Sequence, residues 1–494
     1  MELFLLESVF HHKKRRRRMK SNFAFLEKLN PEAYQCLYKA ESQVRIDYNI
    51  GNNVRKALEA IIYELLRERK LSEKAEKAAR SECRKWDLFD KISALQNTQF
   101  LTKMGWLKQE QKVSQRPFLP PLGKISYMKE DHTADKADGY TFLRRFGNQD
   151  SHIKNPADTD PKIQVLSDYP HAVRALKVIY KLLYQIYQGR VEGLSKEFHE
   201  EYMPIGSFHV DKAYVPNDQK WSGCKTEFLA HHDSDGDERN RSYAILRLYE
   251  KDTERREFLK HKIDAIHRIK DLTPYGIRGM SEIREICPMN NPSPFYIIAY
   301  IFPHEPIPLS DALLQSITMK NRLQICTQVC YCLKELHDLN PPIYYRMLSY
   351  DSIYLCNYSQ GEQKRWAPYL ANFDFAKIIE NDGVTVLPEA NDSLTEIREQ
   401  KRKKYIPPQT HRWETYTDRE WRSVDVYSLG MLFADILSGK IQQDLGEDVF
   451  EKLEEDLSDE FLSFIEKMVS DRAEDRPDTE DVLSAVRKED AAWN

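Results

Sequence analysis

The sequence lacks the features that define several specialised classes of protein. No apolar run approaches the roughly 18 to 20 residues needed to cross a bilayer. The opening segment, MELFLLESVF, places apolar residues before basic ones, which reverses the order of a signal peptide. The eight cysteines form no CxxC pair and no Cys/His ladder at zinc-ligand spacing, which argues against a disulfide framework or a zinc finger. We therefore expect a cytoplasmic protein with no membrane association.

The composition indicates a globular chain of more than one domain. At 494 residues it is too long for one ordinary core, and 41% hydrophobic and 31% charged residues are typical of proteins with packed cores. The net charge is −4, yet residues 1–20 hold seven Lys/Arg against two Glu. We interpret residues 1–19 as a basic disordered leader, with Met19 as an alternative start. A nuclear address or a nucleic-acid arm is the alternative reading of KKRRRR.

Residues 20–188 are predicted to be a helical domain, because apolar residues recur there at helical spacing. The segment NNVRKALEAIIYELLRERK (52–70) carries one apolar stripe. The same spacing predicts helices in WDLFDKISALQN (86–97) and HAVRALKVIYKLLYQIYQ (171–188). The stretch between these last two is polar and rich in Pro and Asp, which indicates loops.

After residue 203 the pattern changes to short β-like runs, and helices dominate again from PLSDALLQ (308–315). Strands followed by helices is the order of an α+β domain. The predicted architecture is therefore an all-α domain at 20–188, a linker at 189–203 and an α+β domain at 204–490. The β-like runs are GSFHVDKAYV, KTEFLAHH, SYAILRLYE and FYIIAYIF.

From about residue 200 to 490 the chain resembles the protein kinase fold, because several motifs occur in that family's order. SYAILRLYE (242–250) resembles the third strand and REFLKHKIDAIHRI (256–269) the C helix. PYLANFDFAKI (368–378) resembles the segment with the Asp-Phe-Gly triplet. SVDVYSLGMLFADILSGK (423–440) resembles the helix whose opening Asp425 caps the catalytic loop. The resemblance implies a bilobal kinase-like domain.

The residues at the catalytic positions differ from those that phosphoryl transfer uses. Transfer needs metal ions, a lysine on the phosphates and an aspartate beside the attacking hydroxyl. In PPIYYRMLSYDSIYL (341–355), Met347 stands in place of that aspartate, and a thioether cannot accept a proton. Asn372 replaces the main metal carboxylate with a neutral amide. Ser349 replaces the loop's lysine, and Ser352 replaces its metal-binding asparagine.

The predicted small lobe has also lost its nucleotide-binding residues. By alternation along YAILRLY, Leu246 occupies the position of the ATP-binding lysine, with Arg247 as the nearest cation. Lys262 aligns with the C-helix glutamate, which reverses the charge; Glu257 is the alternative about one and a half turns earlier.

Three residues with structural duties in kinases are retained: Arg346, Asp425 and Arg476. Loss of several catalytic groups with retention of the scaffold predicts a pseudokinase without a cofactor. ATP binding without turnover is one alternative. Residual serine/threonine kinase activity through rearranged groups such as Asp374 or Asp351 is another.

The one site-like stretch in the first domain is LRRFGNQDSHI (143–153), where Arg145 and His152 are separated by six residues. With its flanking helices, residues 20–188 resemble the HEPN superfamily, and more closely its relatives in bacterial defence and restriction proteins. The resemblance implies an RNA-cleaving pair of Arg and His, with Arg144 as the other candidate arginine and no metal. The alternative is that these polar residues cap helices and order a loop.

The two resemblances together imply a regulator of an RNA-directed or protein-binding activity, in the setting of bacterial defence. A protein partner is expected, RNA is a second candidate ligand, and a homodimer would form through the HEPN-like domain. The alternative from another class is a non-enzymatic scaffold that binds only proteins.

Overall fold

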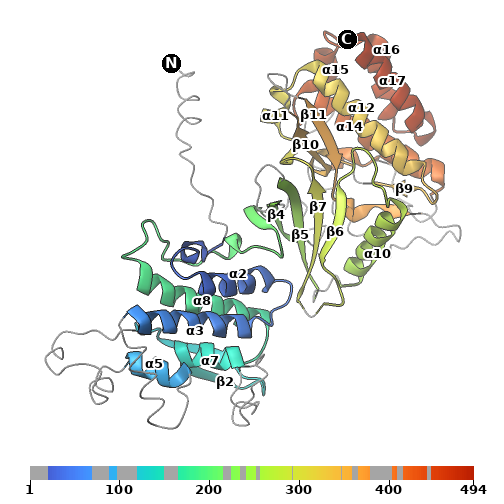
Figure 1. Cartoon of the computed structure of the whole chain (residues 1–494). Coiled ribbons are helices and arrows are strands. Elements are labelled where there is room, and N and C mark those ends of the chain that lie inside the picture. Colours follow the sequence, from blue (N-terminus) through green and yellow to red (C-terminus); the bar gives the residue numbers. More distant parts are fainter. Residues whose placement is uncertain are drawn as a thin grey trace, which may run out of the picture. The chain divides into compact units, whose positions relative to one another are not determined.

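The computed structural model describes residues 21–68, 88–96, 119–148, 165–214, 224–233, 241–251, 256–291, 293–346, 348–358, 365–378, 403–408, 416–441 and 447–493. The chain forms both helices and sheets, which agrees with the predicted mixture of α and β structure (Figure 1). It divides into two compact units: residues 1–213 with 287–295, and residues 214–286 with 296–494.

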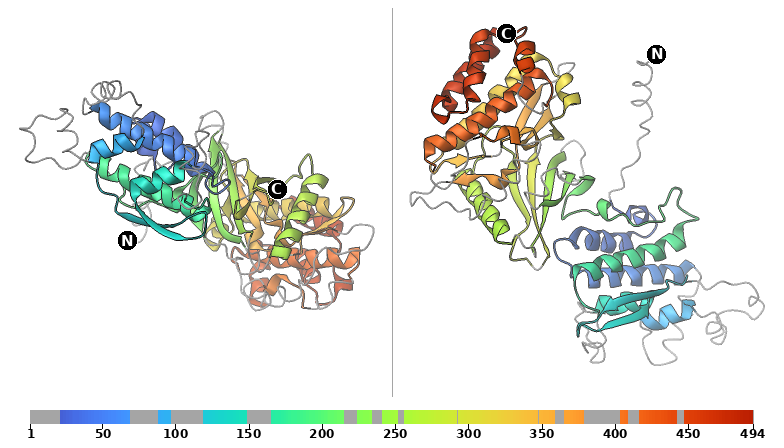
Figure 2. Two further views of the ribbon diagram at one scale, coloured as in Figure 1. Left: turned by 90° about the horizontal axis from the view of Figure 1, so that it is seen from below. Right: turned by 180° about the vertical axis from the view of Figure 1, so that it is seen from behind.

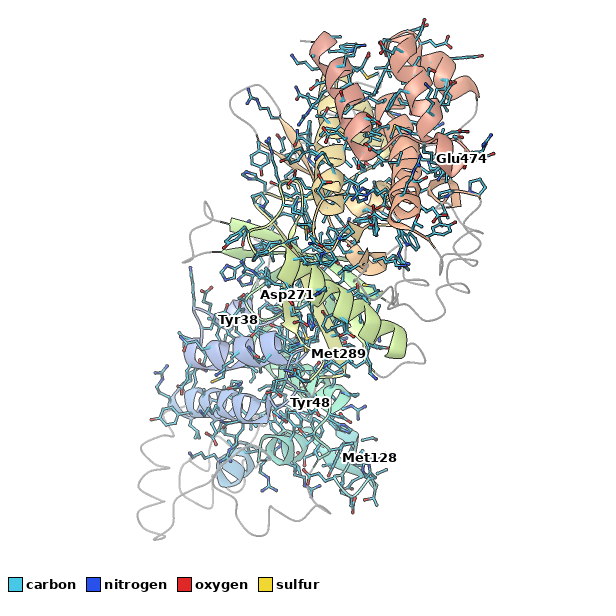
Figure 3. All side chains as sticks on the ribbon, turned by 90° about the vertical axis from the view of Figure 1, so that its right-hand side faces the viewer. Tyr38, Tyr48, Met128, Asp271, Met289 and Glu474 are labelled. Atoms are coloured by element: carbon cyan, nitrogen blue, oxygen red, sulfur yellow. The ribbon has the colours of Figure 1, made fainter. Side chains whose placement is uncertain are left out.

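The first unit is built on helices whose apolar stripes were visible in the sequence. Helices α2, α3 and α8 run side by side (Figures 1 and 2). The 3-10 turn η1 packs on α2, α5 packs on α3, and α7 packs on both α3 and α8. Figure 3 marks α2 by Tyr38 and the first strand by Met128. The helices are η1 (Ala24–Leu26), α2 (Pro31–Gln43), α3 (Gly51–Glu68), α5 (Leu88–Gln96), α7 (Gly139–Asn148), α8 (Tyr169–Tyr187) and η4 (Glu200–Tyr202).

Helices α2 and α8 begin at residues that cap their free backbone N–H groups. The Asn30 side chain accepts a hydrogen bond from Ala33 N, and Asp168 accepts one from His171 N. In each case a proline follows within the first two positions, where its missing N–H costs no hydrogen bond. The predicted helices within 52–70, 86–97 and 171–188 are confirmed, although their ends differ by a few residues.

The prediction of an all-α first domain was wrong. Strands β1 (Lys124–Met128) and β2 (Ala134–Asp138) form an antiparallel hairpin in the stretch that we expected to be loops. The hairpin escaped prediction because only Tyr127 is buried among its ten strand residues, so no clear apolar alternation marks it. The turn is set by Asp131, which accepts hydrogen bonds from Thr133, and by His132, with φ of 60°.

The first unit also contains residues 287–295, which come from a distant part of the sequence. Ser293 Oγ donates to Arg45 O at 2.5 Å, and the Phe295 ring meets Tyr169 edge-on with centroids 4.9 Å apart. Nothing in the sequence pattern indicated this assignment.

In the second unit a sheet precedes a helical part. Strands β4, β5, β7 and β6 form a sheet in this order, and α10 (Arg256–Leu272) lies beside it (Figures 1 and 3). Most strands coincide with the predicted β-like runs, because β-branched and aromatic residues are concentrated there. The strands are β4 (Cys224–Asp233), β5 (Arg241–Glu250), β6 (Glu282–Cys287) and β7 (Phe295–Phe302), whereas β3 (His209–Tyr214) falls almost entirely within the first unit.

The helical part of the second unit is organised around α14, which is buried over most of its length. A capping box at Thr417 and Glu420 fixes where this helix begins, and Gly439, with φ of 73°, ends it. Helices α12 and α16 pack on α14, and α17 packs on α12. The helices are α11 (Asp311–Gln315), α12 (Met319–His337), α14 (Asp418–Ser438), α15 (Glu447–Leu453), α16 (Asp459–Met468) and α17 (Thr479–Ala492).

Short strands and turns carry the predicted catalytic segments. One small sheet has the order β11-β10-β8 and another pairs β12 with β9. These elements are β8 (Ile307–Pro308), β9 (Ile343–Tyr344), η7 (Tyr350–Ser352), β10 (Ile353–Asn357), β11 (Trp366–Leu370), η8 (Phe373–Phe375), β12 (Lys377–Ile378), η9 (Lys403–Tyr405) and η11 (Ala473–Asp475).

Candidate functional site

Asp425 anchors the predicted catalytic loop through the loop's backbone. Its side chain lies on α14 and is fully buried. One carboxylate oxygen accepts a hydrogen bond from Tyr345 N at 2.7 Å, and the other accepts one from Arg346 N at 2.6 Å. Two successive peptide units are therefore fixed where the chain leaves β9.

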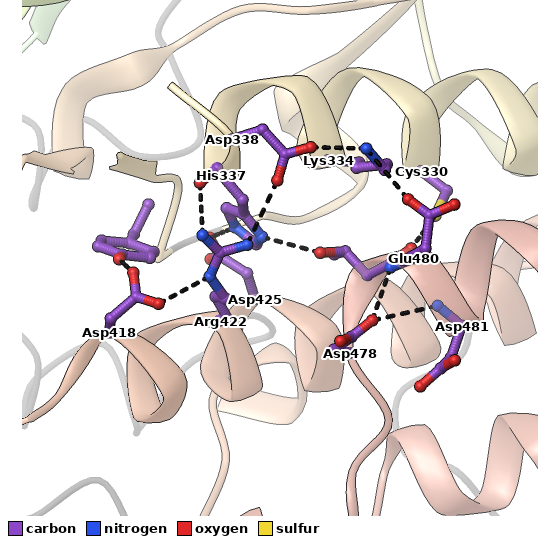
Figure 4. Close-up of polar contacts among 12 residues, drawn as sticks. Cys330, Lys334, His337, Asp338, Asp418, Arg422, Asp425, Asp478, Glu480 and Asp481 are labelled. Carbon is purple, nitrogen blue, oxygen red and sulfur yellow. Dashed lines mark hydrogen bonds and ion pairs between the residues drawn. The ribbon is translucent and has the colours of Figure 1, made fainter. Parts of the chain in front are cut away.

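His337 adds a third contact to Asp425. Its Nε2 lies 2.9 Å from Asp425 Oδ2, and its Nδ1 lies 3.3 Å from Thr479 Oγ1 (Figure 4). Because His337 ends α12 and Thr479 begins α17, the His337 imidazole connects the Asp425 carboxylate on α14 to α17. We did not predict His337 as a site residue; the only signal was its place at the end of a long helix that leads into the loop.

A partly exposed network surrounds this anchor. Arg422 Nη2 donates to His337 O at 2.6 Å. Lys334 Nζ lies 2.6 Å from Asp338 Oδ2 and 3.1 Å from Glu480 Oε2, which links α12 to α17 (Figure 4). Exposed pairs of this kind contribute at most about 1 kcal/mol each, so the buried carboxylate contributes more to holding the loop.

Three residues at predicted catalytic positions bond to their own neighbours. Ser349 N donates to Ser352 Oγ at 3.3 Å, and Ser349 Oγ donates to Asp351 Oδ1 at 2.5 Å. Asn372 has a left-handed backbone with φ of 64°, and its Nδ2 donates to Asp351 O at 2.9 Å. Hydrogen bonds from hydroxyl and amide groups therefore connect residues 349–352 with residue 372. The kinase resemblance would place metal ligands at Ser352 and Asn372.

Two of the predicted positions cannot be placed. Met347 lies outside the described residues, and so does the side chain of Asp374. Within the part of the chain that the structure describes, no group of three or more His, Cys, Asp or Glu could hold a metal ion.

Arg346 is buried beneath an aromatic ring. Its backbone has φ of 64°, its Nε donates to Phe375 O at 2.6 Å, and its guanidinium lies 5.5 Å from the Trp421 ring centroid. Lys377 Nζ lies 4.3 Å from the same ring. Burial lowers the pKa of Arg346 to about 9, and burial together with the nearby Arg346 charge lowers the pKa of Lys377 to about 8.

The structure places Arg247, and not Leu246, on the face of β5 that carries a charged partner. Leu246 pairs with Phe228 across the sheet, whereas Arg247 pairs with Glu227. Arg247 Nε lies 3.8 Å from Glu227 Oε2, and the Tyr354 hydroxyl donates to Glu227 Oε1 at 3.1 Å. A buried ionic and hydrogen-bonded group therefore joins β4 and β5 to β10.

Aromatic rings fill the space next to this group. Phe302 packs on Tyr354 with centroids 5.4 Å apart. The Tyr300 hydroxyl accepts a hydrogen bond from Phe373 N at 3.2 Å, and the Phe373 ring packs edge-on against Tyr345 at 5.1 Å. All five of these side chains are buried, so the junction of the sheet with residues 345–373 is occupied by the protein's own rings.

Lys262 on α10 faces inward, with 2% of its surface exposed. Its Nζ lies 4.5 Å from the Tyr249 ring centroid and 6.0 Å from that of Phe375. These cation–π contacts hold α10 to β5 and to η8. Lys262 stands at the position where the kinase resemblance would place a glutamate paired with a lysine. The side chain of Glu257, the alternative, is outside the described residues.

The 3-10 turn η9 is fastened to α14. Lys404 Nζ lies 2.7 Å from both carboxylate oxygens of Asp435, and the Tyr405 hydroxyl donates to the same carboxylate. Arg476 donates to Ser423 O and Ser423 Oγ at 3.2 Å. Asp435 was not among the predicted site residues, because its partner is set by the tertiary fold rather than by a motif.

In the first unit, Arg145 is held by the hairpin. Its guanidinium donates to the Tyr127 hydroxyl and lies 3.3 Å from Asp135 Oδ2. Hydrogen bonds from the Lys136 backbone and the Tyr127 hydroxyl keep the pKa of Asp135 below its ordinary value, so this carboxylate is charged at neutral pH. His152 lies outside the described residues, so its distance from Arg145 is not defined.

No protein family model and no curated protein sequence matches the chain.

A cavity of about 450 Å³ in the second unit, lined by residues 270, 273–276 and 280–283, lies at the end of α10 and includes none of the predicted site residues. Of the helices that the structure describes, none combines the length and apolar content needed to cross a membrane. The candidate site is therefore the group of residues around Asp425, Asn372 and Glu227.

Proposed function

We propose that the second unit is a protein kinase-like domain that has lost phosphoryl transfer, joined to a HEPN-like first unit, and that the chain is a regulator. One observation carries this proposal. Asp425 fixes the backbone of residues 345 and 346, as a kinase scaffold requires. Ser349, in contrast, donates to Ser352 and to the Asp351 side chain, and Asn372 donates to Asp351 O.

The chemistry of these groups argues against catalysis. Magnesium is held by charged carboxylates, and Ser352 and Asn372 offer only neutral oxygens. Loss of a general base alone typically costs about 10² to 10⁴ in rate, and loss of a charge-stabilising group costs a similar factor. A chain that lacks both retains the shape of the site without its reaction.

The packing of the cleft argues against nucleotide binding as well. The Tyr354 hydroxyl, the Glu227 carboxylate and the Arg247 guanidinium form one buried group, and the Phe302 ring covers Tyr354. A nucleotide would have to displace these contacts and leave a charge unpaired, which is costly in a buried setting. We therefore assign the second unit to protein binding, with no cofactor.

A nucleotide assay tests this assignment. The full chain is mixed with Mg·ATP, and its melting temperature and the transfer of labelled phosphate to itself and to general acceptors are measured. We expect no shift in melting temperature and no transfer, and the same from the Asn372→Asp variant. Metal-dependent transfer that disappears in the Asp374→Ala variant would overturn the proposal.

For the first unit, the contacts of Arg145 favour a structural or binding duty, and RNA cleavage is the second candidate. The hydrogen bond to Tyr127 and the ion pair with Asp135 give this arginine a role in holding the hairpin. Labelled RNA is incubated with the full chain, the Arg145→Ala and His152→Ala variants, and Lys136→Ala as an exposed control in the same hairpin. Equal products from all four remove the nuclease reading. Products lost with His152→Ala but kept with Lys136→Ala would support it.

A further inference from the structure

The first unit buries a carboxyl group that has few partners. Glu41 on α2 has 0% of its surface exposed. Its Oε1 accepts hydrogen bonds from Asn22 N at 3.2 Å and from Asn22 Nδ2 at 2.6 Å. Its Oε2 is sealed from solvent and accepts no hydrogen bond from the residues that the structure describes. An ionised carboxylate in this place would be poorly solvated.

Arg45, a cation whose charge acts on Glu41, uses two of its donors on backbone oxygens. Arg45 Nη1 donates to Met203 O at 3.2 Å, and Nη2 donates to Glu200 O at 2.8 Å. Its charge acts on Glu41 through space and lowers the pKa of the carboxyl, but this effect is smaller than those of burial, Ser21 and Asn22.

The other groups that face Glu41 are neutral. They are the hydroxyl of Ser21, the phenol of Tyr34 on α2 and the phenol of Tyr180 on α8. Burial dominates this setting and raises the pKa of Glu41 to about 7, against the lowering effects of Ser21 and Asn22.

Asn22 connects this carboxyl to a second segment of the chain. Its Nδ2 donates to His199 O at 2.8 Å, and its Oδ1 accepts from His199 N at 2.8 Å. The neighbouring Phe23 is fully buried and packs against Tyr180 and Phe198. The amide of Asn22 therefore fastens residues 21–26 and the chain around His199 to α2 at one point.

We propose that Glu41 is a proton-linked latch: it is protonated when residues 21–26 are docked on α2, and its ionisation loosens Asn22 together with the segment around His199. The ligand of this device is the solvent proton. The latch does not depend on the kinase-like or HEPN-like assignments, because it rests only on contacts within the first unit.

The direction of the effect follows from linkage. The carboxyl is a weaker acid when docked than when released, so docking takes up a proton. The stabilisation of the docked state is fully present below the ordinary glutamate pKa and is lost as pH rises toward 7. Above that pH the stability of the docked state no longer changes. A shift of this size changes the equilibrium for local opening on the order of 100-fold between pH 5 and pH 8, at tenfold for each pKa unit.

Hydrogen exchange of the full chain measures local opening directly. Protection factors are determined at pH 5 and pH 8 for peptides that cover residues 21–30 and 197–203, with correction for the intrinsic exchange rate. We expect protection of both peptides to fall by about two orders of magnitude at pH 8 in the unaltered protein. Glu41→Gln, which has the shape of the protonated acid and does not titrate, should show no such fall.

Two further variants make the result specific. Glu32→Gln, an exposed position on the same helix, should behave like the unaltered protein. Asn22→Ala should remove the pH dependence of peptide 197–203, because the connection to His199 is cut. A pH-dependent loss of protection that persists in Glu41→Gln, or that is absent from the unaltered protein, would overturn the proposal.

Discussion

The anchor at Asp425 and the cluster of Ser349, Ser352 and Asn372 act on the same stretch of chain in different ways. Asp425 is a buried charge with three partners: two backbone N–H groups and His337. In the cluster, Ser349 bonds to Ser352 and to the Asp351 side chain, and Asn372 bonds to the Asp351 backbone. The first arrangement depends on the tertiary fold, since Asp425 on α14 must meet His337 at the end of α12. The serine contacts of the second span only two or three residues, so the conformation of the loop alone is enough to form them.

The largest effect should come from breaking the anchor. Asp425→Ala leaves two backbone N–H groups and His337 without their acceptor in a dry site. We expect the free energy of unfolding to fall by about 3 to 5 kcal/mol, measured by urea denaturation. Asp418→Asn, at the exposed start of α14, is the control and should cost less than about 1 kcal/mol. Similar losses from the two variants would show that Asp425 is not the anchor.

A second buried carboxylate tests whether the scaffold depends on such groups in general. Lys404→Met removes the ammonium group that lies 2.7 Å from both oxygens of Asp435. The stranded charge should cost about 3 kcal/mol, again read from denaturant midpoints. Combining it with Asp435→Leu should recover part of the loss, because no unpaired charge then remains. A double variant that is as unstable as the sum of its parts would contradict this account.

A smaller effect is expected at the group of Tyr354, Glu227 and Arg247. Tyr354→Phe keeps the ring on Phe302 but removes the hydrogen bond to Glu227. We expect a loss of about 1 to 2 kcal/mol, measured by thermal unfolding. Tyr275→Phe, which removes the hydroxyl of a fully exposed ring in the same unit, serves as the control. A gain of Mg·ATP binding in Tyr354→Phe would indicate that this hydroxyl alone closes the cleft.

The cations beside Trp421 should make the stability of the second unit depend on pH. The pKa of Lys377 is about 8 in the folded chain, below its ordinary value, so the folded state disfavours the charged form. Stability should therefore rise as pH increases from about 8 toward the ordinary lysine pKa. Lys377→Met should remove the part of this rise between about pH 8 and 9, below the range in which Arg346, with a pKa of about 9, adds a rise of its own, as seen in melting temperatures between pH 7 and 9. An unchanged slope in the variant would assign the pH dependence to other groups.

The smallest effect should come from the neutral cluster. Asn372→Asp adds a carboxylate next to Asp351 but leaves Ser352 and the group of Tyr354, Glu227 and Arg247 as they are. We expect the free energy of unfolding to change by less than about 1 kcal/mol, and we expect no phosphate transfer. A large stabilisation by Mg²⁺ alone would show that the site still accepts a metal.

The sequence predicted elements whose signal is local. The stripe through Val54, Leu58 and Ile61 predicted α3, and the apolar spacing of residues 171–188 predicted α8, since each helix buries one face against its neighbours. The β1–β2 hairpin was missed because its strands are nearly all solvent-facing. The membership of residues 287–295 in the first unit was missed because it depends on contacts with residues about 250 positions away, such as Ser293 with Arg45.

The same distinction applies to the site. Asp425 and Arg346 could be named because they lie in short motifs. His337, Asp435 and Glu227 could not, because their partners are brought near by the packing of helices and by strand register. Alternation alone pointed to Leu246, whereas the observed pairing of β4 with β5 puts Arg247 opposite Glu227. Charge pairing across a sheet cannot be read from one strand.

The group of Tyr354, Glu227 and Arg247 has a consequence for motion within the second unit. Any displacement of β10 away from β4 and β5 would remove a hydrogen bond from a buried carboxylate, which is costly. We therefore expect these three strands to move as one body.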